Sequence, residues 1–471
     1  MEKLRVFFSK HRVLVIIFAI ALAVRLLLFF INLNVAGGDF IATISGGDGY
    51  YEISKNLIEG RGYTFDEGPD YKAEFLRPPV WIFIMAILAK LFNSYVPVLI
   101  VELFMGSFIP VVGVLLAQRI VLPRLAVAVG ILLALEPFSV LLSFITLTET
   151  SFTFFLLLSL LFVFRYIERR STRNIVWTAV FLALAILIKP TVQFFPILVP
   201  IGLYWIFRKH YSLIFFKHAL YFVITIALIL TPWLYRNQQE FGKVSLSSQA
   251  AFNVYSVLVP SVLSIENGTD FKTEYAALNK VLKERGDEIT PANSSQYMKE
   301  ALSMLSQHKV AFLKSIGISM LTFFTHDGML TVLSYSKVII PNMFNKPVLT
   351  MMLSEPLRLF QLAVAYSKTP AVLVLFGRLG WVIVFMLFLF GTVRYFRREQ
   401  TSSYAYAALG VVLYFALLTT ANGLGMNARF RMPVNAFIFT FAVYGFYFLY
   451  RSIMAKLPTK HEKSFDHHTR I

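Results

Sequence analysis

Apolar stretches long enough to cross a membrane recur along most of this chain, with short polar segments between them. They lie near 13–32, 78–92, 96–118, 125–140, 146–165, 174–189, 191–207 and 213–233, and again near 309–330, 371–394, 403–420 and 431–450. An α-helix of about 20 apolar residues spans a hydrocarbon core of about 30 Å. The pattern predicts an all-α polytopic membrane protein.

Two long polar stretches interrupt this pattern. Residues 35–77 are rich in Gly, Asp and Tyr, and residues 234–308 are nearly balanced in charge. The second stretch is too long to be an ordinary connection between helices. Within it, Leu278–Arg285 and Ser295–Leu305 predict short surface helices.

The distribution of basic residues predicts which side each loop occupies, because short cytoplasmic loops carry the excess of Lys and Arg. The strongest basic clusters are Arg165–Arg173, Arg208–His218, Arg394–Arg398 and the tail after Arg451. Counting helices between them places both termini in the cytoplasm, and both long polar stretches outside. The loops around Glu149, Lys189 and Asn422 are then external as well.

One more basic cluster, Arg119–Arg124, leaves room for a single crossing between Arg77 and Arg119, although two apolar segments lie there. Segment 78–92 is the shorter and follows Arg-Pro-Pro, so we interpret it as a re-entrant or interfacial helix. Region 330–370 is either a pair of crossings or an external hairpin. The sequence therefore predicts 10 or 12 transmembrane helices.

These segments divide the chain into four parts: an N-terminal membrane module over 1–233 that includes the loop 35–77, an external loop over 234–308, C-terminal helices over 309–450, and a basic cytoplasmic tail over 451–471. No internal repeat is evident, which weakens the case for a transporter built from inverted halves. The first apolar segment is too long for a cleaved signal peptide and is interpreted as an anchor.

Composition excludes several classes of protein. Hydrophobic residues make up 57% of the chain and charged residues only 15%, too few charges for a soluble enzyme with one anchor. The net charge of +18 comes from Lys and Arg at the ends of apolar segments, which favours membrane lipids over nucleic acid as partners. With no cysteine, disulfides and thiolate chemistry are excluded.

The first polar stretch contains the most informative carboxylate, Asp48. It follows a pair of glycines and precedes an amphipathic run, Tyr50–Ile58, so it sits at or near a helix N-cap. A capping Asp is the purely structural interpretation. The alternative is a functional carboxylate on the external face.

The order of motifs along the chain favours the functional interpretation. Residues 48–63 read D-G-Y-Y-E-I-S-K-N-L-I-E-G-R-G-Y, and R-P-P follows at 77–79. Downstream lie T-E at 148–149, K-P at 189–190, T-P-W-L-Y-R-N at 231–237 and A-R-F-R-M-P at 428–433. Together they resemble the GT-C superfamily of polytopic glycosyltransferases, near the protein O-mannosyltransferase and aminoarabinose transferase branch.

The resemblance implies a GT-C-like helix bundle with two large external loops. It also implies transfer of a sugar from a polyprenyl-phosphate donor, such as undecaprenyl phosphate, with inversion, at the external face of a bacterial plasma membrane. Asp48 would be the catalytic base. The substrate-binding residues would be Tyr51, Glu52, Arg77, Glu149, Lys189, Trp233, Arg236, Asn237, Arg429 and Arg431.

A phosphate leaving group gathers negative charge, so cations at external helix ends would lower the barrier. Lys189, Arg236, Arg429 and Arg431 meet that description, while the structural alternative is that they extend to lipid headgroups. Four aromatic residues would stack on a sugar or belong to the interfacial aromatic belt: Tyr50, Tyr51, Tyr63 and Trp233.

Two positions depart from the family pattern. Gly49 stands where the family often has a second acidic residue, so Glu52 would have to supply it, and no metal ligand is assigned although a divalent metal is left open. Lys189 replaces an Arg, which keeps the charge but loses the bidentate fork.

The sequence leaves the sugar and the acceptor open: protein, lipid or polysaccharide. Two other functional classes also remain at this stage, a transporter or flippase of an amphiphile and a non-catalytic assembly protein. A transporter would be expected to carry ionisable residues at mid-membrane depth.

Overall fold

The computed structural model describes residues 2–66, 68, 71–208, 213–338, 351, 355–370, 372–398, 402–424 and 428–455. All the regular elements in these residues are helices. The first half of the chain forms α1 (Glu2–Val35), α2 (Phe40–Ile44), α3 (Tyr50–Ile58), α4 (Val80–Phe92), α5 (Val96–Ala117), α6 (Pro123–Leu135), α7 (Pro137–Leu142), α8 (Glu149–Glu168), α9 (Thr172–Ile188), η1 (Pro190–Val192), α10 (Phe195–Phe207) and α11 (Leu213–Phe241).

The second half begins with the short helices α12 (Gln249–Asn253), η2 (Val254–Leu258), α13 (Val259–Asn267), α14 (Phe271–Arg285) and α15 (Ser294–Gln307). It continues through α16 (Lys309–Thr325), α17 (Met329–Tyr335), α19 (Pro356–Ala365), α20 (Val372–Arg398), α21 (Ser403–Thr419), η3 (Thr420–Asn422), α22 (Ala428–Arg431), η4 (Met432–Val434) and α23 (Asn435–Met454). The predicted all-α class is confirmed.

Among the described residues, seven helices are long and apolar enough to cross a membrane, and an eighth is added if α16 and α17 form one span bent by 64°. Four more apolar segments predicted from the sequence form α4, α6, α9 and α10, which have 13 to 17 residues. At 1.5 Å per residue such helices are about 20 to 26 Å long, shorter than the hydrocarbon core. The chain is thus a multi-pass integral membrane protein.

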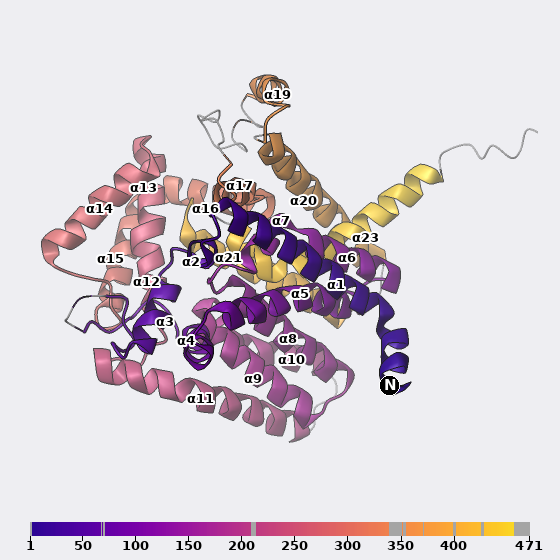
Figure 1. Cartoon of the computed structure of the whole chain (residues 1–471), viewed down its shortest axis with the longest axis horizontal. Helices are drawn as coiled ribbons and strands as arrows, with labels where there is room; N and C mark the ends of the chain where they lie inside the picture. The colour runs from indigo at the N-terminus through magenta and orange to yellow at the C-terminus, as the bar shows by residue number, and fades with distance from the viewer. Residues whose placement is uncertain are drawn as a thin grey trace, which may run out of the picture.

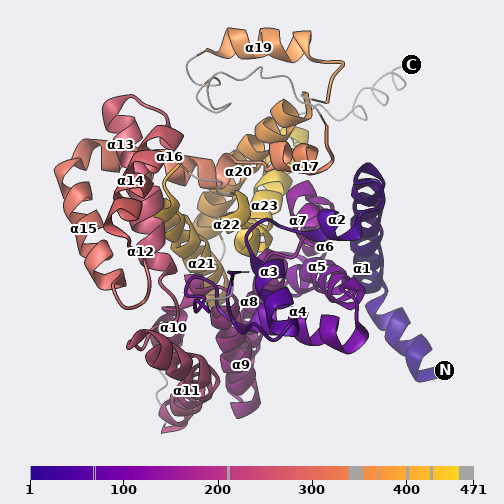
Figure 2. The same cartoon turned by 60° about the vertical axis from the view of Figure 1, so that its left-hand side comes forward.

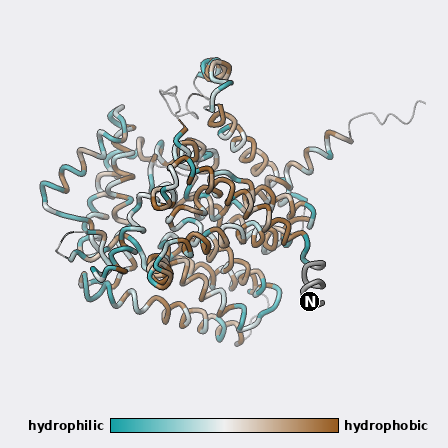
Figure 3. Tube along the Cα trace, in the orientation of Figure 1, coloured by the Kyte–Doolittle hydropathy of each residue, from teal (hydrophilic) through white to brown (hydrophobic). Residues whose placement is uncertain are grey.

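The apolar helices pack into one bundle with a continuous hydrophobic core. α1, α6 and α8 pack on α5, α11 lies along α9, and α20 pairs with α23. Figure 1 shows these long helices side by side, and Figure 3 shows that most of their residues are hydrophobic. Large apolar side chains such as Leu27, Phe104 and Leu228 are exposed on the outside of the bundle, which suits a bilayer rather than water.

The second polar stretch folds into a helical lobe at one end of the bundle, at the left of Figure 1. The lobe has its own hydrophobic cluster, in which the rings of Tyr255 and Tyr297 meet edge to face with centroids 5.0 Å apart. α14 and α15 confirm the two surface helices predicted there. Figure 3 shows that this lobe is more hydrophilic than the bundle.

The predicted segment 125–140 is two helices, because α6 ends at Leu135 and α7 begins at Pro137, with Glu136 between them. Proline lacks an amide hydrogen and disfavours helical backbone in the residue before it. The Glu136 carboxylate fills the gap by accepting hydrogen bonds from the backbone amides of Phe138 (3.3 Å) and Ser139 (2.7 Å). α11, in contrast, is longer than the predicted apolar segment 213–233, because it continues through Pro232 to Phe241.

Region 330–370 contains α17 and α19 in its described part, with 7 and 10 residues. Neither is long enough to cross a hydrocarbon core by itself. Figure 2 shows α19 lying apart from the bundle. Residues 339–350 and 352–354 of this region, and 456–471 of the predicted tail, lie outside the described residues.

Candidate active site at the polar end of the bundle

Two antiparallel helices bring the first pair of charged residues together. α8 and α9 pack along each other and are joined by a short turn after Glu168. The first residue of α8, Glu149, therefore lies beside Lys189, which caps the end of α9. The Lys189 ammonium lies 2.8 Å from a Glu149 carboxylate oxygen. An anion at a helix start and a cation at a helix end are each favoured by the helix dipole.

Arg429 joins this pair from the other end of the chain. It lies in α22, the short turn that opens the last helix. Its guanidinium donates to Glu149 and to the Asp48 carboxylate, which is 381 residues away in sequence. Arg429 thus bridges two carboxylates, and Asp48, Glu149, Lys189 and Arg429 form one ionic cluster.

The Asp48 side chain does not cap a helix, so the capping interpretation is wrong. The N-cap of α3 is Gly49, whose φ of 82° lies in the left-handed region and whose cap has no side-chain hydrogen bond. A Cβ at position 49 would lie 2.6 Å from the Phe65 ring. Glycine is therefore required here by both backbone and space, which explains why a second acidic residue does not follow Asp48.

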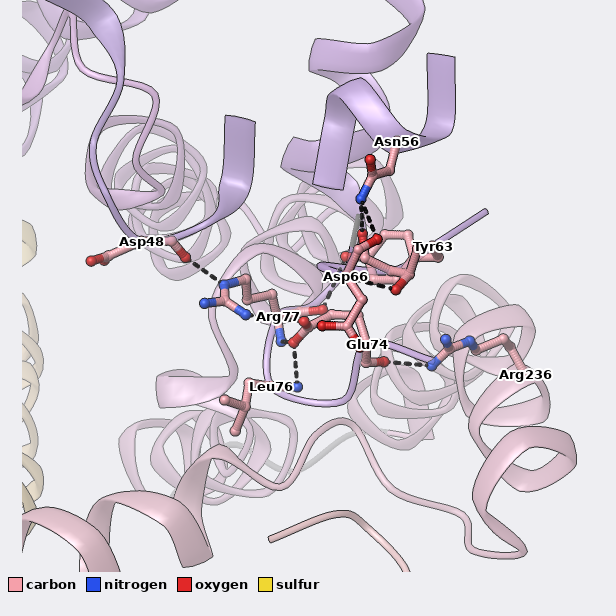
Figure 4. A network of polar contacts seen from close by, with 9 residues as sticks. Asp48, Asn56, Tyr63, Asp66, Glu74, Leu76, Arg77 and Arg236 are labelled. Carbon is pink, nitrogen blue, oxygen red and sulfur yellow. Dashed lines mark hydrogen bonds and ion pairs between the residues drawn. The ribbon is translucent and has the colours of Figure 1, made fainter. Parts of the chain in front are cut away.

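Arg77 holds the backbone around Asp48, not its carboxylate. Its Nε donates to the Asp48 carbonyl oxygen at 2.5 Å, and its Nη1 lies 3.0 Å from a Glu74 carboxylate oxygen. Figure 4 shows Arg77 reaching the backbone of Asp48 while the Asp48 carboxylate points away. The Tyr63 hydroxyl donates to the Arg77 carbonyl oxygen at 3.0 Å. These contacts fix the first loop and leave the carboxylate of Asp48 directed toward Arg429.

A cavity of about 350 Å³ opens beside the ionic cluster. Its lining comes from both ends of the chain and from the second lobe: Gly47, Asp48, Tyr50, Leu76, Arg77, Lys189, Gln249, Phe252, Asn253, Asn422, Arg429 and Phe430. The side chains of Asp48 and Arg429 are 40% and 24% exposed, whereas that of Glu149 is 2% exposed. Asp48 and Arg429 are therefore the members of the cluster most open to the cavity, and Glu149 supports them from behind.

Tyr50 is the aromatic residue of the first loop that reaches the cavity. Burial raises the pKa of its hydroxyl to about 12. The phenol is consequently protonated at neutral pH and can donate a hydrogen bond into the cavity.

Five lining residues were not among the predicted site residues. Gln249, Phe252 and Asn253 come from α12 in the second lobe, Asn422 from η3, and Phe430 lies between the two arginines of α22. Asn422 and Phe430 lie in segments that the sequence singled out, the loop after 403–420 and the motif at 428–433. For Gln249 and Asn253 the available signal was their spacing, four residues apart on one helix face.

A separate, apolar cavity lies among the helices of the bundle. It has a volume of about 300 Å³ and is lined by α8, α10 and α21, with Phe195, Gly202 and Tyr414 among its walls. A third cavity of about 180 Å³ shares Lys189, Gln249, Asn253, Asn422 and Phe430 with the polar cavity. It also contains Phe194 and Leu418, next to the apolar one. Polar and apolar spaces therefore follow one another along α10 and α21.

Trp233, Arg236 and Asn237 do not line the polar cavity; they fasten α11 to the loops. The Trp233 indole donates to the Leu246 carbonyl oxygen at 2.8 Å, and Arg236 donates to the Glu74 carbonyl oxygen at 2.8 Å. Asn237 donates to the Ser245 carbonyl oxygen at 2.7 Å. Figure 4 shows Arg236 reaching Glu74. Arg236 thus holds the first loop, while Trp233 and Asn237 hold the start of the second polar stretch, all from outside the cavity.

The remaining predicted residues also lie outside the cavity lining. Tyr51 packs on Tyr95 with ring centroids 4.8 Å apart, and Glu52 has one buried oxygen without a partner in the described residues. Arg431 is 1% exposed, with its guanidinium 3.4 Å from the centroid of the Trp381 ring. It donates to the Phe323 carbonyl oxygen at 2.7 Å. Arg431 thus points into the protein, while Arg429 points into the cavity.

The donor groups of the described residues do not fit a metal ion. No group of three His, Cys, Asp or Glu side chains converges among them. Asp48 and Glu149, the two carboxylates of the ionic cluster, are both paired with Arg429. We therefore derive no step through a metal.

Comparison with known proteins gives one family match. Residues 76–235, about a third of the chain, match the family model of dolichyl-phosphate-mannose-protein mannosyltransferases. No protein of curated function matches.

Among solved structures, the chain is similar to the oligosaccharyltransferase AglB from Archaeoglobus fulgidus in complex with an inhibitory peptide and a dolichol-phosphate. The identity is 14% and the TM-score 0.48, over 97% of this chain and 53% of AglB. It is also similar to ArnT from Cupriavidus metallidurans bound to undecaprenyl phosphate, at 15% identity and a TM-score of 0.41, over 95% of this chain and 81% of ArnT. The chain thus spans about half the length of AglB, and TM-scores below 0.5 carry no argument about ligands.

The family match contains the motifs at 77–79, 148–149 and 189–190 and most of the one at 231–237, but not those at 48–63 and 428–433, which supply Asp48 and Arg429. It begins next to Arg77, includes the α8–α9 hairpin with Glu149 and Lys189, and ends beside Arg236. The predicted resemblance to GT-C glycosyltransferases is confirmed: residues 76–235 are similar to the dolichyl-phosphate-mannose-protein mannosyltransferases, which are enzymes of that superfamily.

Proposed function

We propose that this protein transfers a glycosyl group from a polyprenyl-phosphate donor to an acceptor hydroxyl, with inversion, on the non-cytoplasmic face of a bacterial plasma membrane. The observation that carries the proposal is the meeting of Asp48 and Arg429 at one cavity. A carboxylate can accept a proton and a guanidinium can bind phosphate, and the reaction needs both within one substrate length. The family match supports the choice of reaction.

In the proposed reaction, the acceptor oxygen attacks the anomeric carbon while the bond from that carbon to the phosphate oxygen breaks. Asp48 takes the proton of the acceptor hydroxyl, and the polyprenyl phosphate leaves with the bonding electron pair. A single displacement of this kind inverts the anomeric centre. Asp48 suits the role of base because its side chain is 40% exposed and oriented by Arg77 through the backbone.

Charge on the leaving group is the second requirement. As the glycosidic bond breaks, negative charge grows on the phosphate, and cations placed nearby lower the barrier. Arg429 and Lys189 line the cavity and share Glu149 as a buried counterion. A donor phosphate would compete with Asp48 for Arg429, so donor binding would also free the base.

The apolar cavity supports a lipid-linked donor. A polyprenyl chain stays in the bilayer, whereas its phosphate must reach the polar site. Both environments adjoin here. The polar cavity and the third cavity share Lys189, and the third cavity includes Phe194, which is next in sequence to Phe195 in the wall of the apolar cavity. We propose that the phosphate lies at Lys189 and Arg429 and the chain runs along α10 and α21.

The sidedness can be tested directly, because the natural chain has no cysteine. A single Lys280→Cys change in the second lobe is expected to react with an impermeant maleimide on intact cells. The matched control, Arg173→Cys in the first turn of α9, is expected to react only after permeabilisation. The reverse pattern would place the site in the cytoplasm and overturn the proposed localisation.

The activity is tested by transfer of radiolabelled sugar from a synthetic polyprenyl-phosphate donor in proteoliposomes. We expect label to move into an acceptor fraction in the wild-type protein and not in Asp48→Asn, with the product anomer opposite to that of the donor. Movement of intact labelled donor across the bilayer without sugar transfer would instead establish a transporter and reject the glycosyltransferase.

A further inference from the structure

The polar cavity has two walls of different chemistry. One wall is ionic and consists of Asp48, Arg77, Lys189 and Arg429, all from the bundle and the first loop. A second set of lining residues, the uncharged wall, comes mainly from the second lobe and the loop after α21: Gln249, Phe252, Asn253, Asn422 and Phe430. Only the ionic wall has a part in the proposed chemistry. The uncharged wall is a feature that this chemistry does not explain.

The side-chain amides of this wall are free to bind a ligand. Gln249, Asn253 and Asn422 are each only partly buried, and within the described residues their side-chain amides have no hydrogen-bond partner in the protein. Partly exposed amides without a protein partner can bond to water, and a ligand that enters the cavity can replace that water with its own hydroxyl groups. Gln249 and Asn253 are four residues apart on α12, which places them on the same helix face.

We infer that Gln249, Asn253 and Asn422 recognise the hydroxyl groups of the transferred sugar, and that this sugar is an uncharged, polyhydroxylated glycosyl group. The inference rests on the proposed function and extends it to residues outside the family match, which ends at residue 235. An amide presents both N–H donors and a carbonyl acceptor, and therefore matches a hydroxyl, which also donates and accepts.

Aromatic residues complete the match to a sugar. Phe252 and Phe430 lie in the lining next to the amides, and the Phe430 ring stacks under the Lys189 ammonium at 4.8 Å. A sugar has an apolar face of C–H groups and a rim of hydroxyls. Pockets for such ligands combine apolar or aromatic walls with a few polar groups that fix orientation.

Charge in the cavity argues against an amino sugar. Among the described lining residues there is one carboxylate, Asp48, beside three cations, Arg77, Lys189 and Arg429. Asp48 is engaged by Arg429 and is assigned to the acceptor proton. An ammonium group on the sugar would meet repulsion from the cations and no unoccupied counterion, which costs binding free energy.

The test compares variants of the amide wall with a matched amide elsewhere in the same lobe. Asn253→Ala and Gln249→Ala remove wall amides, and Gln296→Ala removes an exposed amide on α15, outside the cavity lining. Donors are synthetic polyprenyl phosphates carrying a neutral hexose, the corresponding deoxyhexoses, or a 4-amino-pentose, with sugar-free polyprenyl phosphate as a binding probe.

We expect each wall variant to lower kcat/KM for the neutral-hexose donor about tenfold, as for loss of one hydrogen bond in a partly desolvated site. One deoxyhexose should be insensitive to the variant, because it lacks the hydroxyl that the amide binds. Binding of sugar-free polyprenyl phosphate and the activity of Gln296→Ala should not change. The wild type should prefer the neutral hexose over the amino-pentose.

Three results would overturn the inference: unchanged kcat/KM in both wall variants, an equal loss for every deoxyhexose, or a preference for the amino-pentose. Failure of the proposed function looks different. There the wild type itself would show no transfer and no binding of sugar-free polyprenyl phosphate, whatever the variant.

Discussion

Two arginines separated by one residue occupy opposite environments in this protein. Arg429 faces a cavity and bridges Asp48 and Glu149, with 24% of its side chain exposed. Arg431 is 1% exposed, stacks on Trp381 and donates to a backbone carbonyl of α16. The two side chains leave the same short turn in different directions.

The surroundings of Arg431 form a second, fully buried polar region. Nearby, Arg378 and Asp327 pair at 3.1 Å with side chains 7% and 3% exposed. Burying charges is costly unless partners compensate, so such groups stabilise one arrangement of helices rather than bind a ligand. The comparison teaches that an arginine at a helix end becomes a candidate for chemistry when a cavity leaves it accessible, and a structural element when the interior encloses it.

The largest effect is expected from the base. Asp48→Asn keeps the size of the side chain and should lower kcat by about 100-fold or more, the range of general base catalysis. Donor binding should survive or tighten, because Asn competes less with phosphate for Arg429. The measurement is the transfer rate at equal membrane abundance, together with the donor Kd. Near-wild-type turnover would remove Asp48 from the mechanism.

Arg429→Ala comes next and tests the cavity side of the comparison. Loss of a phosphate ligand in a partly desolvated site should weaken donor use by about 2 kcal/mol or more, or about 30-fold in kcat/KM. Because Glu149 keeps Lys189 as a partner, the protein should remain folded. Donor kinetics matching the wild type would assign Arg429 a structural role.

Arg431→Ala tests the buried side and should act on stability instead. It would leave the Phe323 carbonyl without its donor and a space beside Trp381, at a cost of about 2 to 3 kcal/mol. The detergent-solubilised variant should have a lower Tm, with an unchanged KM for donor in the molecules that remain folded. A raised KM at unchanged Tm would show that the phosphate contacts Arg431 after all.

The smallest effect is expected from Glu52→Gln. Glu52 lies in the first turn of α3 but outside the cavity lining, and one of its oxygens is buried without a partner in the described structure. Removing its charge should leave kcat within about twofold, as for most changes away from functional contacts. A loss comparable to that of Asp48→Asn would restore Glu52 as the second carboxylate of the site.

Much of the fold could be predicted from the sequence because its cause is local. Apolar length sets each long helix, and α14 and α15 follow from the amphipathic pattern of the second polar stretch. Pro137 was visible in the sequence, yet the break before it was missed because the apolar run continues through it. The 64° bend between α16 and α17 had no comparable signal.

The site was predicted in part. Whether a predicted residue lines the cavity depends on the direction in which its side chain points, not on its residue type. Asp48, Glu149, Lys189 and Arg429 converge as expected from residues placed at external helix ends. Trp233, Arg236 and Asn237 lie inside α11, which continues to Phe241, and they point at the loop backbone. Motif order finds the elements of a site but does not tell which way a side chain leaves its helix.

The sequence by itself determined that the chain spans a membrane, that its polar chemistry gathers in two stretches and at helix ends, and which superfamily it resembles. Apolar length, charge distribution and motif order can be read along the sequence without knowing which helices pack together. Only the tertiary structure decided that Arg429 and not Arg431 meets Asp48, and that α12 supplies the amides of the cavity. Those choices depend on helix rotation and on contacts across hundreds of residues, which packing alone sets.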